Sequence, residues 1–188
     1  MKHLLTGLLI ALNPLYLSAQ PEKATLTEAI SADETLSVAH RFMAVYEGTW
    51  TEEASLFTTE GAEPEKFILT TVINMVMSGR FLQCTRTGTL HAAPFEGLTT
   101  IGYDKDSGLF TLCLISTEST ATRIFEGRWK EPGTSIVLQS HQDARGNNNV
   151  TARMTITFED KDNFRIETFE TDDKGAFYKN REYHFSRQ

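Results

Sequence analysis

The pair Arg181 and Tyr183 has the residue types and the spacing needed to bind an anion. Side chains two apart in a strand point to the same face, and the set that shares this face is Phe177, Lys179, Arg181, Tyr183 and Phe185. The aromatic members predict that the face points inward. An inward arginine needs an anionic partner, since an unpaired buried charge is costly. The pair therefore predicts a site for an acidic ligand, or else an internal salt bridge to a protein carboxylate, which is the commoner solution for a buried charge.

Arg86, Tyr103 and His141 complete the predicted ligand-binding set. Arg86, in the same way as Arg181 or Tyr183, would fix the polar end of a small amphipathic molecule, while aromatic side chains contact its apolar part. His141 directly precedes a loop and is expected at the mouth of the fold. Together these five residues predict one cavity for a small molecule.

Catalytic signatures are sparse. The sequence has no G-x-S-x-G nucleophile elbow, no phosphate-binding loop, no H-E-x-x-H motif and no zinc-site spacing of Cys and His. Acidic residues near the C-terminus alternate with basic ones, which is typical of charge pairing between strands. We predict no catalytic residue, no metal and no cofactor, and we keep an enzyme that acts on a small ligand as the alternative.

One helix precedes the strands that must position these residues. Ser31-Ala32-Asp33-Glu34 matches the S-x-x-E capping box, which predicts a helix start. An apolar stripe at helical spacing follows, and Gly48 is expected to end the helix as its C-terminal cap. The stripe consists of Leu36, Ala39, His40, Met43 and Tyr46.

After Trp50 the apolar pattern changes to a period of two, as in strands with one buried face. Clusters of Gly, Asp, Asn and Pro between the alternating segments predict turns. About ten strands are expected, at 49–57, 66–77, 80–90, 97–103, 109–116, 121–129, 135–141, 150–158, 163–171 and 177–185. Their regular spacing and short connections favour an all-β fold, a single antiparallel up-and-down barrel with one N-terminal helix and room inside for one small ligand.

Two expectations depend on this strand order. Cys84 and Cys113 should be free, buried thiols, because the strand between them separates their own strands by roughly 9.6 Å, beyond the limit of roughly 7 Å for a disulfide. The strand at 109–116 is apolar on both faces. Either the helix packs on its outer face, or an exposed patch there serves dimer contact.

Gly48-Thr49-Trp50, directly after the helix, resembles the G-x-W signature of the calycin superfamily, which includes lipocalins and fatty-acid-binding proteins. The resemblance implies that Trp50 packs at the closed end of the barrel beneath the helix. It also implies that a basic residue of the last strand, here Arg187, stacks on the indole ring.

Two further features are implied by the same resemblance. Arg181 and Tyr183 resemble the R-x-Y pair with which fatty-acid-binding proteins hold a carboxylate. Haem is the one cofactor left open, because some ten-stranded barrels of the superfamily hold iron through a single histidine; the histidines considered are His40, His91, His141 and His184.

A second resemblance covers His40 to Arg187, which is nearly the whole chain after the predicted signal peptide. It rests on His40 to Trp50, Gly79-Arg80-Phe81-Leu82, Phe95-Glu96-Gly97, Gly102-Tyr103-Asp104, Gly127 and Tyr183 to Arg187. Together these are similar to the bacterial domain-of-unknown-function family fifteen-seventy-nine, a group of exported lipocalin-like barrels to which no activity is assigned. Cys113 and Ile115 stand where that family often has an aromatic and an acidic residue.

The 188 residues, 40% of them apolar, suffice for one domain with a core. The formal charge of −7 argues against nucleic acid or an anionic membrane surface as partner. Residues 1–19 follow the order of a cleavable signal peptide, with Lys2, an apolar run and small Ala19 at the cut. No cysteine follows Ala19 to carry a lipid.

Residues 20–32 are therefore expected to be a flexible lead-in, and residues 33–188 the barrel. We expect a periplasmic or secreted protein without a membrane span, and leave its oligomeric state open. Its expected function is to bind a small apolar or amphipathic molecule in the barrel. Besides the enzyme, the alternative is a ligand-free structural or interaction protein of the cell envelope.

Overall fold

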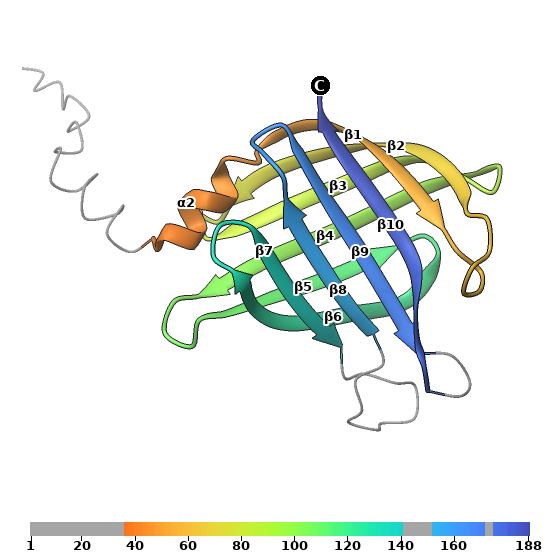
Figure 1. The fold of residues 1–188 in the computed structure, drawn as a ribbon. Helices are drawn as coiled ribbons and strands as arrows, with labels where there is room; N and C mark the ends of the chain where they lie inside the picture. The colour runs from red at the N-terminus through yellow and green to blue at the C-terminus, as the bar shows by residue number, and fades with distance from the viewer. Residues whose placement is uncertain (1–35, 141–151, 172–174) are drawn as a thin grey trace, which may run out of the picture. The chain divides into compact units, whose positions relative to one another are not determined.

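The computed structural model describes residues 36–140, 152–171 and 175–188. A short helix is followed by ten antiparallel strands (Figure 1). Their bounds are α2 Val38–Ala44, β1 Gly48–Leu56, β2 Glu65–Val76, β3 Phe81–Leu90, β4 Ala93–Asp104, β5 Leu109–Ser116, β6 Ser119–Glu131, β7 Ser135–Ser140, β8 Ala152–Phe158, β9 Asn163–Thr171 and β10 Phe177–Arg187. No helix in this part of the chain is long and apolar enough to cross a bilayer.

The strands close into one barrel in the order β1-β10-β9-β8-β7-β6-β5-β4-β3-β2. Each strand pairs with its neighbours in the sequence, and β1 closes the barrel on β10, with Trp50 opposite Arg187. Closure leaves no unpaired strand edge. The predicted all-β, ten-stranded, up-and-down barrel with one short helix is confirmed.

The helix begins and ends differently from the prediction. It begins after Ser37, whose backbone N–H donates to Nδ1 of His40 at 3.1 Å, so Leu36 precedes the helix; the Ser31–Glu34 box lies outside the described residues. Gly48 does not cap the helix, which ends at Ala44. Instead, Gly48 is the first residue of β1 and has a φ of +137°. A Cβ at Gly48 would come within 2.7 Å of Nη1 of Arg187.

Helix α2 packs on one end of the barrel, where the buried side chains of Met43 and Tyr46 line the interior. It does not cover the outer face of β5, where Thr111 and Ile115 are exposed. Packing of the helix therefore does not explain the apolar outer residues of that strand.

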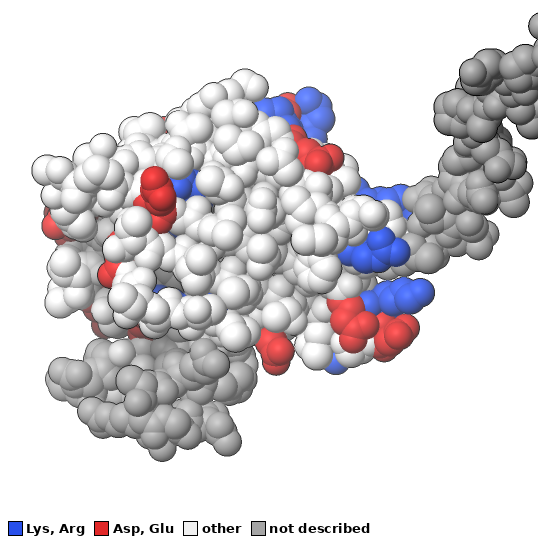
Figure 2. Space-filling model, turned by 180° about the vertical axis from the view of Figure 1, so that it is seen from behind, with Lys and Arg blue, Asp and Glu red and all other residues white. Residues whose placement is uncertain are grey.

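Charged side chains are sparse over much of the face seen in Figure 2.

The core lies inside the barrel, where Trp50, Phe110 and Phe125 are almost completely buried. Cys84 and Cys113 are free, as expected, but both are partly rather than fully buried. Strand β4 lies between them: Cys84 pairs with Thr99 of β4, and Cys113 pairs with Thr100 of the same strand.

Strand β10 contains an irregularity that changes which residues face inward. Its register with β9 shifts between Lys179 and Arg181. After the shift Arg181, Tyr183 and Phe185 face the interior, as predicted. Before it, Lys179 forms ion pairs with Glu167 and Glu182, and Phe177 contacts the exposed Arg153. The inward face predicted for Phe177 and Lys179 is therefore wrong, because a bulge inverts the alternation of side chains.

Candidate functional site

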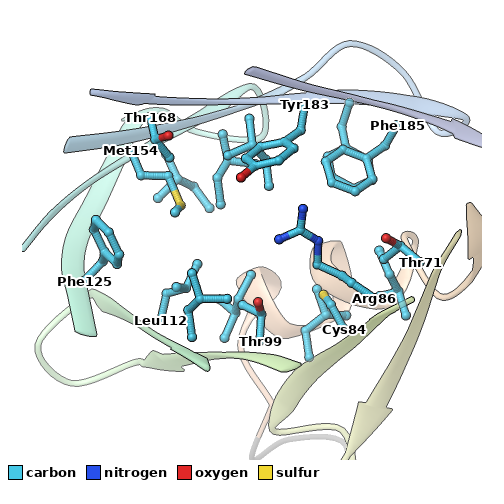
Figure 3. A pocket seen from close by; sticks show the side chains of 18 of the residues that line it. Thr71, Cys84, Arg86, Thr99, Leu112, Phe125, Met154, Thr168, Tyr183 and Phe185 are labelled. Atoms are coloured by element: carbon cyan, nitrogen blue, oxygen red, sulfur yellow. The ribbon is translucent and has the colours of Figure 1, made fainter. Parts of the chain in front are cut away.

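The interior of the barrel holds a cavity of about 100 Å³. Its walls are mainly hydrocarbon, with a few polar side chains among them (Figure 3). The apolar lining includes Leu112, Phe125, Ile136, Met154, Ile156 and Phe185. An apolar pocket with a few placed polar groups is the usual composition of a small-molecule site.

One end of the barrel is closed by aromatic side chains around Trp50. The indole N–H of Trp50 donates to the backbone carbonyl of Tyr46 at 3.1 Å. The ring of Phe164 packs edge-on against the indole at 4.9 Å between centroids, and the Arg187 guanidinium lies 4.3 Å from the indole centroid. The structure thus brings Trp50 and Arg187 together beneath the helix.

Arg187 also holds the backbone of this closed end. Its terminal nitrogens donate to the carbonyls of Glu47 at 2.6 Å, Val45 at 2.8 Å and Lys161 at 2.7 Å, and its Nε donates to Oδ1 of Asp162 at 3.0 Å. A planar guanidinium presents five donors in a fixed arrangement. It therefore ties the connection after α2 to the turn between β8 and β9.

Within the barrel, Arg86 forms an ion pair with Glu52, a residue that the sequence-based prediction missed. The carboxylate of Glu52 is fully buried and accepts from Nε of Arg86 at 2.9 Å, from Nη2 of Arg86 and from Oγ1 of Thr71 at 2.6 Å. Figure 3 shows the guanidinium of Arg86 projecting into the cavity, and it lies 4.7 Å from the ring centroid of Tyr183. Period-two alternation from an inward Trp50 would have placed Glu52 on the inner face.

The predicted pair Arg181 and Tyr183 lines the same cavity, near its mouth. Nη1 of Arg181 donates to Oε2 of Glu118 at 2.8 Å, and Nη2 donates to Oε1 at 3.3 Å. The hydroxyl of Tyr183 accepts from Nη1 of Arg181 at 3.4 Å. Of the two partners considered for Arg181, the structure therefore contains the protein carboxylate.

This ion pair crosses the barrel opening. Glu118 lies in the turn between β5 and β6, whereas Arg181 belongs to β10, which three strands separate from β6. A second pair, Arg123 with Glu170 at 2.6 Å, joins β6 to β9. Both pairs connect strands that are not neighbours in the barrel, so they span its mouth.

The structure does not place Tyr103 at the cavity. Its ring packs against Phe110 at 4.7 Å and against His40 at 5.8 Å, near the helix. The ligand-binding role predicted for Tyr103 thus has no support from its position. His141 lies outside the described residues.

The described histidines do not suit a haem. His40 is bound to Ser37, His91 pairs with Glu65, and His184 faces outward beside Glu182. No described histidine lines the cavity, and a volume of about 100 Å³ is too small for a porphyrin. The residues of this cavity therefore do not fit that cofactor.

Cys84 is the only thiol among the described residues that line the cavity. Burial raises the pKa of its thiol to about 12. The thiolate is the reactive form of cysteine, so at neutral pH this side chain is held as the thiol and forms part of the apolar wall.

The model of the family described as "Protein of unknown function (DUF1579)" matches residues 35–187. Among curated proteins, none matches the chain. A solved structure, Rv2717c from M. tuberculosis, is similar with a TM-score of 0.59 at 17% identity, over 81% of this chain and 99% of that chain. At this identity the likeness concerns the fold alone.

Two further solved structures score lower. A redesigned beta barrel has a TM-score of 0.43 at 12% identity, over 79% of this chain and 96% of its own. The protein EF1p2_mFAP2b, solved bound to DFHBI, has the same score and identity, over 79% of this chain and 98% of its own.

Proposed function

The chain belongs to the family described as Protein of unknown function (DUF1579), and because that description assigns no activity, we propose from the cavity itself that the barrel binds one small, largely apolar molecule. One observation carries the proposal: the interior is not filled by side chains but keeps a cavity with a mainly hydrocarbon wall. Empty apolar cavities in proteins can take up apolar molecules of matching size.

The volume limits the size of the ligand. A cavity of about 150 Å³ lined by aliphatic and aromatic groups accommodates benzene, and the cavity here has about 100 Å³. The ligand is therefore no larger than a single small ring or a short alkyl chain. A substituted ring such as benzamide enters with movement of Met43 and Met154, which both line the cavity, because methionine side chains adapt readily.

A matched pair of substitutions tests this proposal. Thr99 lines the cavity (Figure 3), so Thr99→Phe fills part of it. Thr155 lies on the opposite, outer side of β8 between inward Met154 and Ile156, so Thr155→Phe leaves the interior unchanged. The probe is benzamide, an uncharged single-ring compound, and binding is followed through the NMR signals of Ile136 and Met154.

We expect the unmodified protein and Thr155→Phe to bind benzamide with equal affinity, and Thr99→Phe to lose the shifts. Equal binding by Thr99→Phe would place the probe outside the barrel and contradict the proposal. Absence of binding by the unmodified protein would favour the ligand-free structural role. Far-ultraviolet circular dichroism of each variant checks that the barrel is retained.

The cellular location is a separate part of the proposal. Residues 1–19, outside the described part, carry the basic, apolar and small-residue order of a cleavable signal peptide. We propose that the protein is exported to the periplasm or the medium. Peptide mapping of the protein from its host should find Gln20 at the N-terminus, and a retained Met1 would contradict the proposal.

A further inference from the structure

All three arginines that line the cavity among the described residues have a protein carboxylate as partner. Arg86 is paired with Glu52, Arg123 with Glu170, and Arg181 with Glu118. Each positive charge is thus offset by a negative charge of the protein itself. A ligand that brings its own carboxylate would meet no unpaired cation here, and it would add a negative charge beside one already present.

The ion pair between Arg181 and Glu118 determines whether an acidic ligand can bind at the mouth of the barrel. Nη1 and Nη2 of Arg181 both donate to Glu118, so a second carboxylate would compete with that side chain for the guanidinium and would lie beside its negative charge. Besides Glu118, the hydroxyl of Tyr183 lies 3.4 Å from Nη1 of Arg181. Without Glu118, the guanidinium and this hydroxyl would form a ready-made anion site.

Hydrogen bonds of the backbone hold the turn that carries Glu118 in place. The amide N–H of Glu118 donates to Oγ of Ser116 at 3.3 Å, and the N–H of Thr117 donates to the carbonyl of Glu96 at 2.9 Å. The turn that carries Glu118 is thus bound both to β5 and to β4. It presents a carboxylate across the opening to the far wall.

We infer that Glu118 is a specificity-determining residue, which occupies Arg181 and thereby reserves the cavity for uncharged ligands. This inference deepens the proposed function and depends on it. A protein can reject a competing ligand by placing a like charge against it. Glu118 does this for acids, whereas a neutral ligand of the same shape is unaffected.

Arg86 cannot replace Arg181 as the binding partner of an acidic ligand, because its own carboxylate partner, Glu52, is held in place. The side chain of Glu52 is 0% exposed and holds three donors, so it has no route into water. The side chains of Arg181 and Glu118 are 29% and 28% exposed, and exposed ion pairs contribute little to stability. Removal of the carboxylate at position 118 should therefore change ligand choice without unfolding the barrel.

The test compares benzamide with benzoate, which has nearly the same shape and carries a carboxylate. Glu118→Gln removes the negative charge and keeps the size of the side chain. Glu182→Gln is the matched control, because Glu182 is the neighbour of Arg181 on the outer face and pairs with Lys179. The double variant Glu118→Gln with Arg181→Met removes the cation as well. Affinities are measured by NMR titration at neutral pH.

We expect the unmodified protein to bind benzoate at least about tenfold more weakly than benzamide, which corresponds to about 1.4 kcal/mol. Glu118→Gln should raise the affinity for benzoate about tenfold and leave that for benzamide unchanged. Glu182→Gln should change neither, and the double variant should lose the gain. A merely structural role of Glu118 would alter both ligands alike.

Two results would overturn the inference while the proposed function survives. One is equal affinity of the unmodified protein for the two compounds. The other is an unchanged affinity of Glu118→Gln for benzoate while benzamide still binds. Failure of benzamide to bind the unmodified protein would instead remove the proposed function, and the inference with it.

Discussion

Arg187 and Arg181 lie on the same strand at opposite ends of the barrel and are almost equally exposed, with 26% and 29% of their side chains accessible. Arg187 donates to three backbone carbonyls and stacks on a fully buried indole. Arg181 donates to one side-chain carboxylate on a turn and one hydroxyl. The two arginines are therefore about equally exposed but have different roles. The backbone partners of Arg187 fix the structure of the closed end, whereas the side-chain partners of Arg181 at the mouth can be exchanged for other groups.

Replacement of Trp50 should have the largest effect. The indole is 0% exposed and contacts Tyr46, Phe164 and Arg187. Trp50→Ala leaves a large cavity, and we expect the free energy of unfolding to fall by about 4 kcal/mol. Urea denaturation followed by circular dichroism measures it. A loss below about 1 kcal/mol would mean that the closed end is not the stable part of the barrel.

The ion pair of Glu52 and Arg86 lies between the two ends of the barrel. Like the contacts at the closed end, it should contribute strongly to stability. Glu52→Leu leaves a buried guanidinium without its carboxylate, and we expect a loss of about 3 kcal/mol. Addition of Arg86→Met should restore most of that loss, because a buried ion pair is often replaceable by apolar side chains. Urea denaturation of the two single variants and the double variant completes the cycle. A double variant less stable than Glu52→Leu would contradict this account.

The same substitution at each end tests the opening comparison directly. Arg187→Met loses several charge-assisted hydrogen bonds and the contact with Trp50, and we expect a loss of about 2 kcal/mol. Arg181→Met loses an exposed pair, and we expect a loss below about 1 kcal/mol. Thermal and urea unfolding of both variants provide the measurement. Equal losses would show that exposure, and not the kind of partner, determines the contribution of each arginine.

The fold was predictable from the sequence because it rests on repeated local signals. Period-two alternation and turn residues predicted ten strands, and short connections predicted their order. The inward position of Arg181 and Tyr183 followed from the same alternation. The failure at Lys179 also has a local cause, because one extra residue in β10 reverses every side chain before it.

The candidate site was less predictable, since its contacts join distant parts of the chain. Glu118 and Arg181 are 63 positions apart, and no local pattern relates a turn between two strands to the opposite wall. Tyr103 was assigned from its type, but its place in β4 puts it near the helix. Sequence patterns thus predicted which residues face inward better than which of them meet.

Protonation of His40 should give the smallest effect, and it belongs to the closed end. Burial lowers the pKa of His40 from its ordinary value of 6.5, and the charge of Arg80 lowers it further, against a hydrogen bond with the backbone of Tyr103 that raises it. Nδ1 of His40 accepts the N–H of Ser37 at the start of α2, and it can do so only without a proton.

The sign of the pH dependence follows from these contacts. Well above pH 6.5 His40 is neutral in both the folded and the unfolded chain, so its full contribution is present. As the pH falls below 6.5, the unfolded chain binds the proton first, and stability decreases until His40 of the folded chain is protonated as well. The pKa of Asp104 and that of Asp160 are lowered by hydrogen bonds, so these groups act in the same direction but only near pH 4 and below.

Urea denaturation between pH 7 and pH 5 isolates His40 from those carboxylates. We expect His40→Gln to abolish most of the decrease in stability over this range. His91→Gln, at a side chain 56% exposed, should retain it. Equal slopes in the two variants would assign the proton to another group and leave the start of α2 insensitive to pH. If only His40→Gln loses the pH dependence of the free energy of unfolding, the contacts of His40 at the start of α2 contribute to the stability of the closed end. Met43 and Tyr46 of the same segment line the cavity there.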